Sequence, residues 1–67
     1  MNLTAALLRL VPGAHFDTMT PDGEPIEHGC VVQTRPIRQG RYFYFDGLDS
    51  EGVECSFITA MVSRVYR

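Results

Sequence analysis

The residues best suited to binding a partner lie in the middle of the chain. Three of its six arginines directly precede the aromatic run Tyr-Phe-Tyr-Phe. Arginine beside exposed aromatic side chains binds single-stranded nucleic acid by charge and stacking, and both Arg and Tyr are enriched at the hot spots of protein interfaces. A third interpretation, in which the tyrosines are half-buried and the arginines are solvated or paired with local acids, involves no partner. The candidate binding residues are Arg35, Arg38, Arg41, Tyr42 and Tyr44.

The best cluster of metal-ligating or nucleophilic side chains is His28 with Glu24, Glu27 and Cys30. Its spacing matches no known metal pattern. Cys30 and His28 are two residues apart and would share one face of a strand, but a nucleophile also needs a third group that orients its base. A chain of this size encloses little volume for a substrate. We therefore predict no catalytic residue, metal, cofactor or small-molecule substrate, and no enzyme activity.

The two cysteines, Cys30 and Cys55, are far apart and match neither a CxxC nor a zinc pattern. We expect them to be reduced and to pack as small apolar residues, which suits the cytosol. A disulfide is the alternative if their strands pair. The apolar start of the chain lacks a basic leading region, is interrupted by Arg9 and is too short to span a bilayer. We therefore expect a cytoplasmic protein without membrane contact.

Residues 3–11 are predicted to form a short helix. Asn2 is a suitable N-cap, and Pro12-Gly13 is a stop signal. A helix this short is not stable alone, so it must pack against something. We expect its leucines to cover a sheet, and the alternative is a helix that docks on a partner.

The rest of the chain is predicted to form short strands joined by turns. The expected strands cover 14–20, 30–34, 41–45, 52–58 and 61–66, with turn signals at 21–23, 39–40 and 46–52. In the first strand Phe16 is expected to face inward, with His15 and Asp17 facing outward. In the last strand both faces carry apolar residues, so the alternation does not decide which face is buried.

The period of two also predicts the core. It places Phe43 and Phe45 on one face of their strand, and Tyr42 and Tyr44 on the other. The predicted core consists of Phe43, Phe45, Val53 and Phe57, covered by Leu7 or Leu8.

These elements define an α+β fold that is mostly β, in one small domain over 1–67. The N-terminal helix and its cap occupy 1–13, and a curled antiparallel sheet of about five strands occupies 14–67. Small antiparallel sheets remove their edges by curling into a barrel. The fourth strand, the one-turn break and the short last strand resemble the end of an SH3-like barrel, and the leading helix is similar to that of Sm-like barrels. This resemblance concerns the order of elements, and such folds host many functions.

The size and the charge of the chain limit the classes of function that it can have. A chain of 67 residues buries only about 60% of its unfolded surface, so it usually needs a disulfide, a metal or a partner chain. The formal net charge is −2, from six basic and eight acidic residues, whereas nucleic-acid binders usually carry a basic excess. All six basic residues are arginine, which is typical of GC-rich bacterial and phage coding.

We therefore predict a non-catalytic protein-interaction module, inhibitory or regulatory, encoded by a bacterium, phage or plasmid. It would bind a larger protein or self-associate as a homo-oligomer. The alternative is a small β-barrel that binds RNA or single-stranded DNA through the Arg/Tyr face, and a third interpretation is a subunit of an enzyme complex. The acidic stretch Asp17, Asp22, Glu24 and Glu27, together with the arginines, would make a charge-polarised surface that favours head-to-tail or heterologous contacts between proteins.

Overall fold

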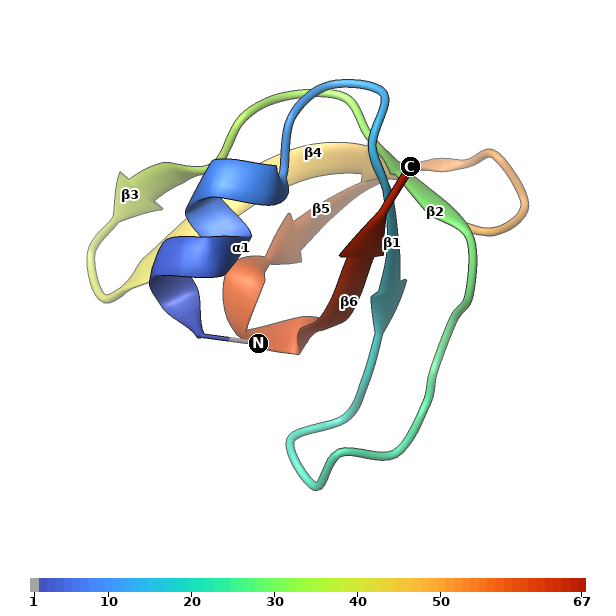
Figure 1. Cartoon of the computed structure of the whole chain (residues 1–67), viewed down its shortest axis with the longest axis horizontal. Coiled ribbons are helices and arrows are strands. Elements are labelled where there is room, and N and C mark those ends of the chain that lie inside the picture. The colour runs from blue at the N-terminus through green and yellow to red at the C-terminus, as the bar shows by residue number, and fades with distance from the viewer. Residues whose placement is uncertain (1) are drawn as a thin grey trace.

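A computed structural model describes residues 2–67 as one short helix and a six-stranded antiparallel sheet (Figure 1). The elements are α1 (Leu3–Arg9), β1 (His15–Thr18), β2 (Cys30–Val32), β3 (Ile37–Gln39), β4 (Tyr42–Leu48), β5 (Glu54–Ile58), the 3-10 turn η1 (Thr59–Met61) and β6 (Val62–Tyr66). The sheet runs in the order β3-β4-β2-β1-β6, and β5 pairs with β4. The prediction of an α+β, mostly β fold is confirmed.

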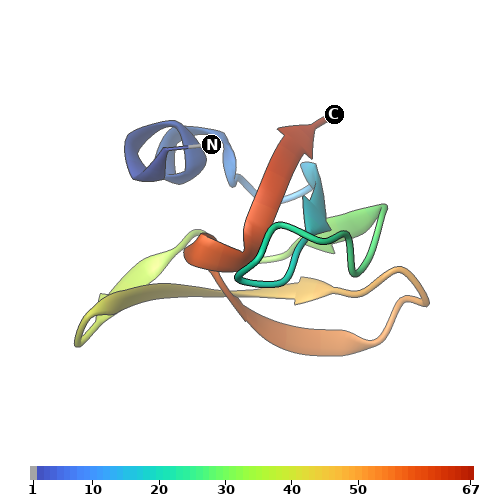
Figure 2. The ribbon, with the colours of Figure 1, turned by 90° about the horizontal axis from the view of Figure 1, so that it is seen from below.

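The sheet curls without closing. β4 pairs with β3 along its first half and with β2 at its end, while β5 pairs with β4 alone. Within residues 2–67 the two strands on either side of η1, β5 and β6, do not pair, so a closed barrel is not confirmed. Figure 2 shows β3, β4 and β5 as one layer, with α1 and β6 on one side of it and no segment on the other.

The helix begins as predicted and ends earlier. The Asn2 side chain accepts a hydrogen bond from the Ala5 N–H at 2.8 Å, which confirms the N-cap. The helix stops at Arg9 rather than at residue 11, and Leu10 leaves the helical conformation with ψ at 75°. Pro12 explains the early end, because a proline pushes the residue before it toward an extended conformation.

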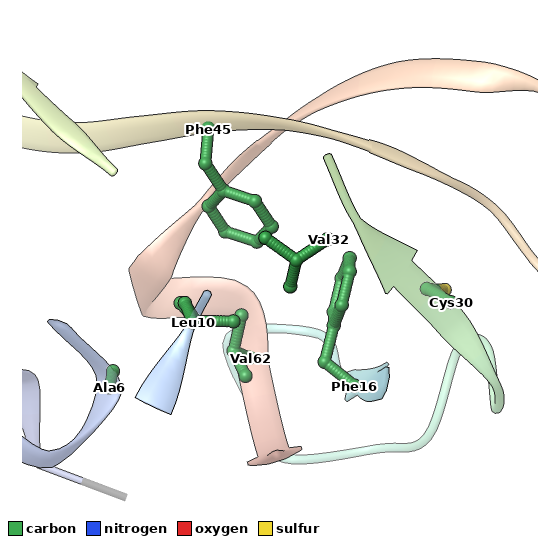
Figure 3. Close-up of a cluster of buried hydrophobic side chains, with 7 residues drawn as sticks. All are labelled: Ala6, Leu10, Phe16, Cys30, Val32, Phe45 and Val62. Carbon is green, nitrogen blue, oxygen red and sulfur yellow. The ribbon is translucent and has the colours of Figure 1, made fainter. Parts of the chain in front are cut away.

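The core lies between the curled strands and α1 (Figure 3). The ring of Phe16 contacts Phe45 and Phe57 edge-on, with centroid separations of 5.1 Å and 4.9 Å. Phe57 is half-buried and packs against this core, and Phe43 is half-buried. The buried apolar residues are Ala6, Leu10, Phe16, Cys30, Val32, Phe45 and Val62.

The prediction of the core was wrong at two positions. Val53 is 55% exposed, because β5 begins at Glu54 and Val53 lies in the connection that precedes it. Leu8 is 73% exposed, and Leu7 is only half-buried. Ala6 and Leu10, one turn apart, cover the core instead, because residues four apart lie on the same face of a helix and the Leu10 N–H still donates to the Ala6 carbonyl oxygen.

A β-bulge settles which face of β6 is buried. Val65 is the partner of Phe16 and Val62 is the partner of Thr18, with a register shift between Asp17 and Thr18. The extra residue changes the phase of the strand. Val62 and Val65 therefore both reach the core although they are three residues apart.

Two features of the β3–β4–β5 layer differ from the prediction. β3 is an additional strand: Pro36 and Gly40 are breaking signals, yet the segment between them pairs with β4 over three residues. β4 extends to Leu48, through Gly47, which the sequence pattern places in the turn. A Cβ on Gly47 would lie 2.6 Å from the Val31 carbonyl oxygen. The glycine is thus required by the close approach of β2.

Candidate functional site

Those predicted binding residues that belong to the β3–β4 hairpin fall on two different surfaces. Paired residues on antiparallel strands point to the same face of a sheet. Tyr42 pairs with Gln39, and Tyr44 pairs with Ile37, whereas Arg38 pairs with Phe43. The two tyrosines therefore share one face, and Arg38 lies on the opposite one. The Arg/Tyr cluster is not a single surface.

The outer tyrosine face, as we name it, consists of Ile37, Tyr42, Tyr44 and Ile58. Tyr44 pairs with Ile37 of β3 on one side and with Ile58 of β5 on the other, so the three form one row across the layer. The Tyr42 ring meets the Tyr44 ring edge-on, with centroids 6.4 Å apart. Ile37 is 60% exposed and Tyr42 is 49% exposed. This face is the side of the layer that no segment covers in Figure 2.

The three arginines are exposed and have no acidic partner. Arg35 lies in the connection between β2 and β3. Arg38 donates a hydrogen bond from Nε to the Gly40 carbonyl oxygen at 3.1 Å. The ion pairs within residues 2–67 both involve Asp17, so none of these arginines pairs with an acid. Their charges remain available to a partner.

Arg41 lines an open groove between the start of α1, the start of β4 and η1. We name it the Arg41 groove, and its volume is about 240 Å³. Its walls are mostly apolar, and they include the half-exposed Leu3 side chain. The lining residues are Asn2, Leu3, Ala6, Met19, Arg41, Tyr42, Phe43, Thr59, Ala60 and Val62.

A polar cluster around Asp17 was not predicted. The Asp17 carboxylate accepts hydrogen bonds from the Tyr66 hydroxyl at 2.8 Å and from the Gly29 N–H at 3.0 Å. His28 Nδ1 lies 2.8 Å from the same oxygen. Arg64 Nε lies 3.7 Å from the other carboxylate oxygen. The outward direction of Asp17 was expected, but its partners come from the end of the 19–29 segment and from β6.

Aromatic contacts reinforce this cluster. The Tyr66 ring stacks on His15 and on His28, with centroid separations of 5.8 Å and 5.7 Å. The Arg64 guanidinium lies 4.4 Å from the centre of the Tyr66 ring. His15 Nδ1 is buried and has no hydrogen-bond partner among the described residues. We define the Asp17 cluster as His15, Asp17, His28, Arg64 and Tyr66.

Electrostatics in the Asp17 cluster favour a charged carboxylate and a neutral phenol. Burial by itself raises the Asp17 pKa, but the hydrogen bonds from Gly29, Tyr66 and His28, with the charge of His28, outweigh it, so the pKa is lowered. Burial raises the pKa of the Tyr66 hydroxyl, and its hydrogen bond to the nearby Asp17 carboxylate raises it further. The cluster contains no nucleophile beside a base. It links the end of the β1–β2 loop to β6.

The candidate metal and nucleophile cluster does not assemble. His28 turns to Asp17 rather than to Cys30, and no group of three or more potential metal ligands occurs in the described chain. Burial and the Glu27 carboxylate raise the Cys30 pKa to about 11, so this thiol stays protonated and is a poor nucleophile. Cys30 and Cys55 are both free, as expected, and the alternative disulfide is not formed.

Neither the comparison with protein-family models nor the searches of curated proteins and solved structures found a match to this chain. Over residues 2–67, no helix has both the length and the apolar character needed to cross a bilayer. The function must therefore be argued from the two surfaces of the β3–β4 hairpin and from the Asp17 cluster.

Proposed function

We propose that this chain is a non-catalytic protein-interaction module, inhibitory or regulatory, that binds a larger protein through the outer tyrosine face. The observation that carries the proposal is the row of Ile37, Tyr44 and Ile58 on the side of the β3–β4–β5 layer that no segment covers (Figure 2). Contiguous exposed apolar surface marks interaction sites in soluble proteins. Tyrosine adds a large contact area with few rotatable bonds and is enriched at hot spots.

The arrangement of charge favours a protein over nucleic acid. Binding of a single strand needs aromatic rings and cations along one groove. The register separates Arg38 from Tyr42 and Tyr44, so the stacking surface and this cation face different directions. The net charge of −2 also opposes the approach of a polyanion. Nucleic acid is therefore the second candidate.

We also propose that the curled sheet is a partly open small barrel of the SH3-like kind. The order β4, β5, one 3-10 turn and β6 supports this assignment, as does the return of β6 to pair with β1. In such a fold the layer formed by β3, β4 and β5 can bind a partner while the other strands complete the core.

The test is capture of a partner by the immobilised chain from an extract of its native host, with and without nuclease. We expect the wild type to capture a protein whether or not nuclease is added. This capture should be lost for Ile37→Ser and Tyr44→Ser, because both substitutions shorten the apolar row. Val53→Ser is the matched control, since Val53 is about as exposed as Ile37 but lies in the β4–β5 turn. Circular dichroism checks that each variant is folded.

Two outcomes would reject the proposed protein partner. One is equal capture by wild type, Ile37→Ser and Tyr44→Ser. The other is sub-micromolar binding of a single-stranded oligonucleotide at physiological salt, with an affinity that falls steeply as salt rises because phosphate contacts release counterions. The second outcome would favour the nucleic-acid alternative.

A further inference from the structure

We infer that two copies of this chain form a dimer by exchanging their β1–β2 loops. In this dimer the Ile26 side chain of each copy enters the Arg41 groove of the other. The inference goes beyond the proposed function and uses a surface that shares only Tyr42 with the outer tyrosine face, so the row of Ile37, Tyr44 and Ile58 stays free in the dimer. It is carried by an exposed isoleucine on an ordered loop, an open apolar groove, and the opposite charges beside them.

The β1–β2 loop holds an apolar side chain out into solvent. Ile26 is 50% exposed, yet its N–H donates a hydrogen bond to the Thr18 carbonyl oxygen at 3.0 Å. The Thr18 N–H in turn donates to the Glu27 carbonyl oxygen at 2.9 Å. The Gly23 N–H closes the loop tip on Thr20. Because the loop backbone is already ordered, little conformational entropy is lost when the loop binds a partner.

The Arg41 groove is a suitable acceptor for a branched aliphatic side chain. Ala6, Phe43 and Val62 contribute apolar surface to it, and the exposed Leu3 side chain forms one wall. Filling the groove would remove apolar surface from water on both partners, which is the main favourable term in association. Its one charged lining residue, Arg41, has no ion-pair partner within residues 2–67.

Charge sets the direction in which the loop enters. Asp22 and Glu24 precede Ile26, are exposed, and form no ion pair within the described chain. Glu27 is different, because its carboxylate accepts the Ser50 N–H at 2.8 Å. The free acids of the loop thus meet the free Arg41 at the groove. Such rim pairs steer association and fix its register, while the apolar insertion supplies most of the affinity.

Loop and groove adjoin on one side of the molecule, which allows a closed dimer. Met19 lines the groove and also forms a bridge with Pro25 of the loop. In Figure 1 the start of α1, η1 and the β1–β2 loop all lie at the lower side. A two-fold axis beside this side lets each copy donate its loop and receive that of its partner. Such self-complementary contacts are the commonest arrangement of homodimers.

Sedimentation equilibrium over a range of protein concentrations tests the inference. We expect wild type to reach the mass of two copies and not to exceed it. Ile26→Ser, which removes the inserted side chain, and Arg41→Glu, which places an acid opposite the acidic loop, should each weaken dimerisation at least about tenfold. All these positions are exposed, so the fold should persist, and circular dichroism checks it. Ile37→Ser on the outer tyrosine face is the matched control and should leave the dimer unchanged.

Mixing the two variants gives a sharper test. Ile26→Ser keeps an intact groove, and Arg41→Glu keeps an intact loop, so a mixed pair retains one of the two contacts. The mixed pair gathers both substitutions in its other contact, and a contact already broken by one substitution loses little more from the second. An equimolar mixture should therefore dimerise more tightly than either variant alone. The inference is overturned if wild type stays monomeric at millimolar concentration, or if the mixture associates no better than its components. It is also overturned if Ile37→Ser abolishes the dimer while Ile26→Ser does not.

Discussion

The Asp17 cluster and the β3–β4 hairpin carry the same kinds of side chain and use them in opposite ways. In the Asp17 cluster the carboxylate accepts hydrogen bonds from Tyr66 and Gly29 and lies within ion-pair distance of His28 and Arg64. Before and within the hairpin, Arg35, Arg38 and Arg41 form no ion pair with an acid of residues 2–67. Tyr42 and Tyr44 contact each other ring to ring along their own strand. Arg and Tyr thus occur in both regions, but only in the Asp17 cluster does an acid accept their hydrogen bonds or pair with their charge.

This difference separates a structural role from a binding role. The Asp17 carboxylate and the Tyr66 hydroxyl are satisfied internally, so a ligand at either would have to replace existing hydrogen bonds at no net gain. The charged and aromatic groups of the hairpin are mostly solvated, and a partner that supplies acids and apolar surface would add contacts at the cost of at most the Arg38–Gly40 hydrogen bond. The Asp17 cluster should therefore contribute to stability and the hairpin to binding.

The largest effect is expected where β4 passes from its pairing with β3 to its pairing with β2. Gly47→Ala would place a methyl group 2.6 Å from the Val31 carbonyl oxygen and 3.3 Å from the Phe57 ring. Overpacking of a buried site costs about 1–3 kcal/mol, and a clash with backbone belongs at the upper end. We expect a loss of about 3 kcal/mol in the free energy of unfolding, measured by urea denaturation.

Gly40→Ala is the matched control, since Gly40 lies at the hairpin turn with φ at 65° and its added methyl group would meet nothing within 4 Å. It should lose about 1 kcal/mol from left-handed strain alone. Equal losses for the two glycines would show that β2 can move away from β4 freely. The contact between β2 and β4 would then be looser than the packing at Gly47 indicates.

A smaller effect on the free energy of unfolding distinguishes the Asp17 cluster from the β3–β4 hairpin. Asp17→Ala leaves the Tyr66 hydroxyl and the Gly29 N–H without their acceptor, and hydrogen bonds to a charged group contribute about 1.5–3 kcal/mol. We expect a loss of that size in the free energy of unfolding. The double variant Arg38→Ala/Arg41→Ala should change it by less than about 0.5 kcal/mol, as is usual for exposed side chains. Both are measured at several protein concentrations, because a contribution from dimerisation makes the apparent stability depend on concentration.

The opposite result would reverse the division of roles. If the double arginine variant is the less stable one, the hairpin arginines hold the fold together, and their availability to a partner is lost. If Asp17→Ala is neutral, the cluster is a solvated surface rather than a link between the loop and β6.

Local patterns predicted most of the elements because their causes lie within a few residues. The Asn2 cap, the inward Phe16 and the alternation of Phe43 and Phe45 against the tyrosines depend only on neighbours in the chain. This alternation did not place the arginines. Arg41 lies in the turn just before β4, and Arg38 could be placed only once the pairing of β3 with β4 was known.

The rest depends on contacts between distant segments. Asp17 and Tyr66 are 49 residues apart, and only the pairing of β1 with β6 brings them together. The bulge opposite Asp17 and Thr18 changes the phase of β6, which no period-two pattern contains. Gly47 resembles a turn residue in sequence, and only the approach of Val31 shows that it belongs to a strand.

The smallest expected effect is the acid dependence contributed by Asp17. Its pKa is lowered in the folded protein below the ordinary value of 3.8, so the folded state binds this proton more weakly than the unfolded state. The resulting stability is fully present above pH ~4 and is lost as the pH falls through the folded pKa. The groups that face this carboxylate are His28, Arg64 and Tyr66.

The measurement compares urea denaturation of wild type and Asp17→Asn between about pH 6 and pH 2.5, with the window set by the lowered pKa. Asn keeps an oxygen acceptor for Tyr66 and Gly29 but cannot ionise. The stability advantage of wild type should be constant above pH ~4 and should shrink below it, because protonated Asp17 loses its attraction for His28 and Arg64. The other seven acidic residues are the same in both proteins. An advantage that stays the same down to the lowest pH would mean that the hydrogen-bond acceptor matters and the charge does not, and the Asp17 cluster would then be held by hydrogen bonds and ring stacking alone.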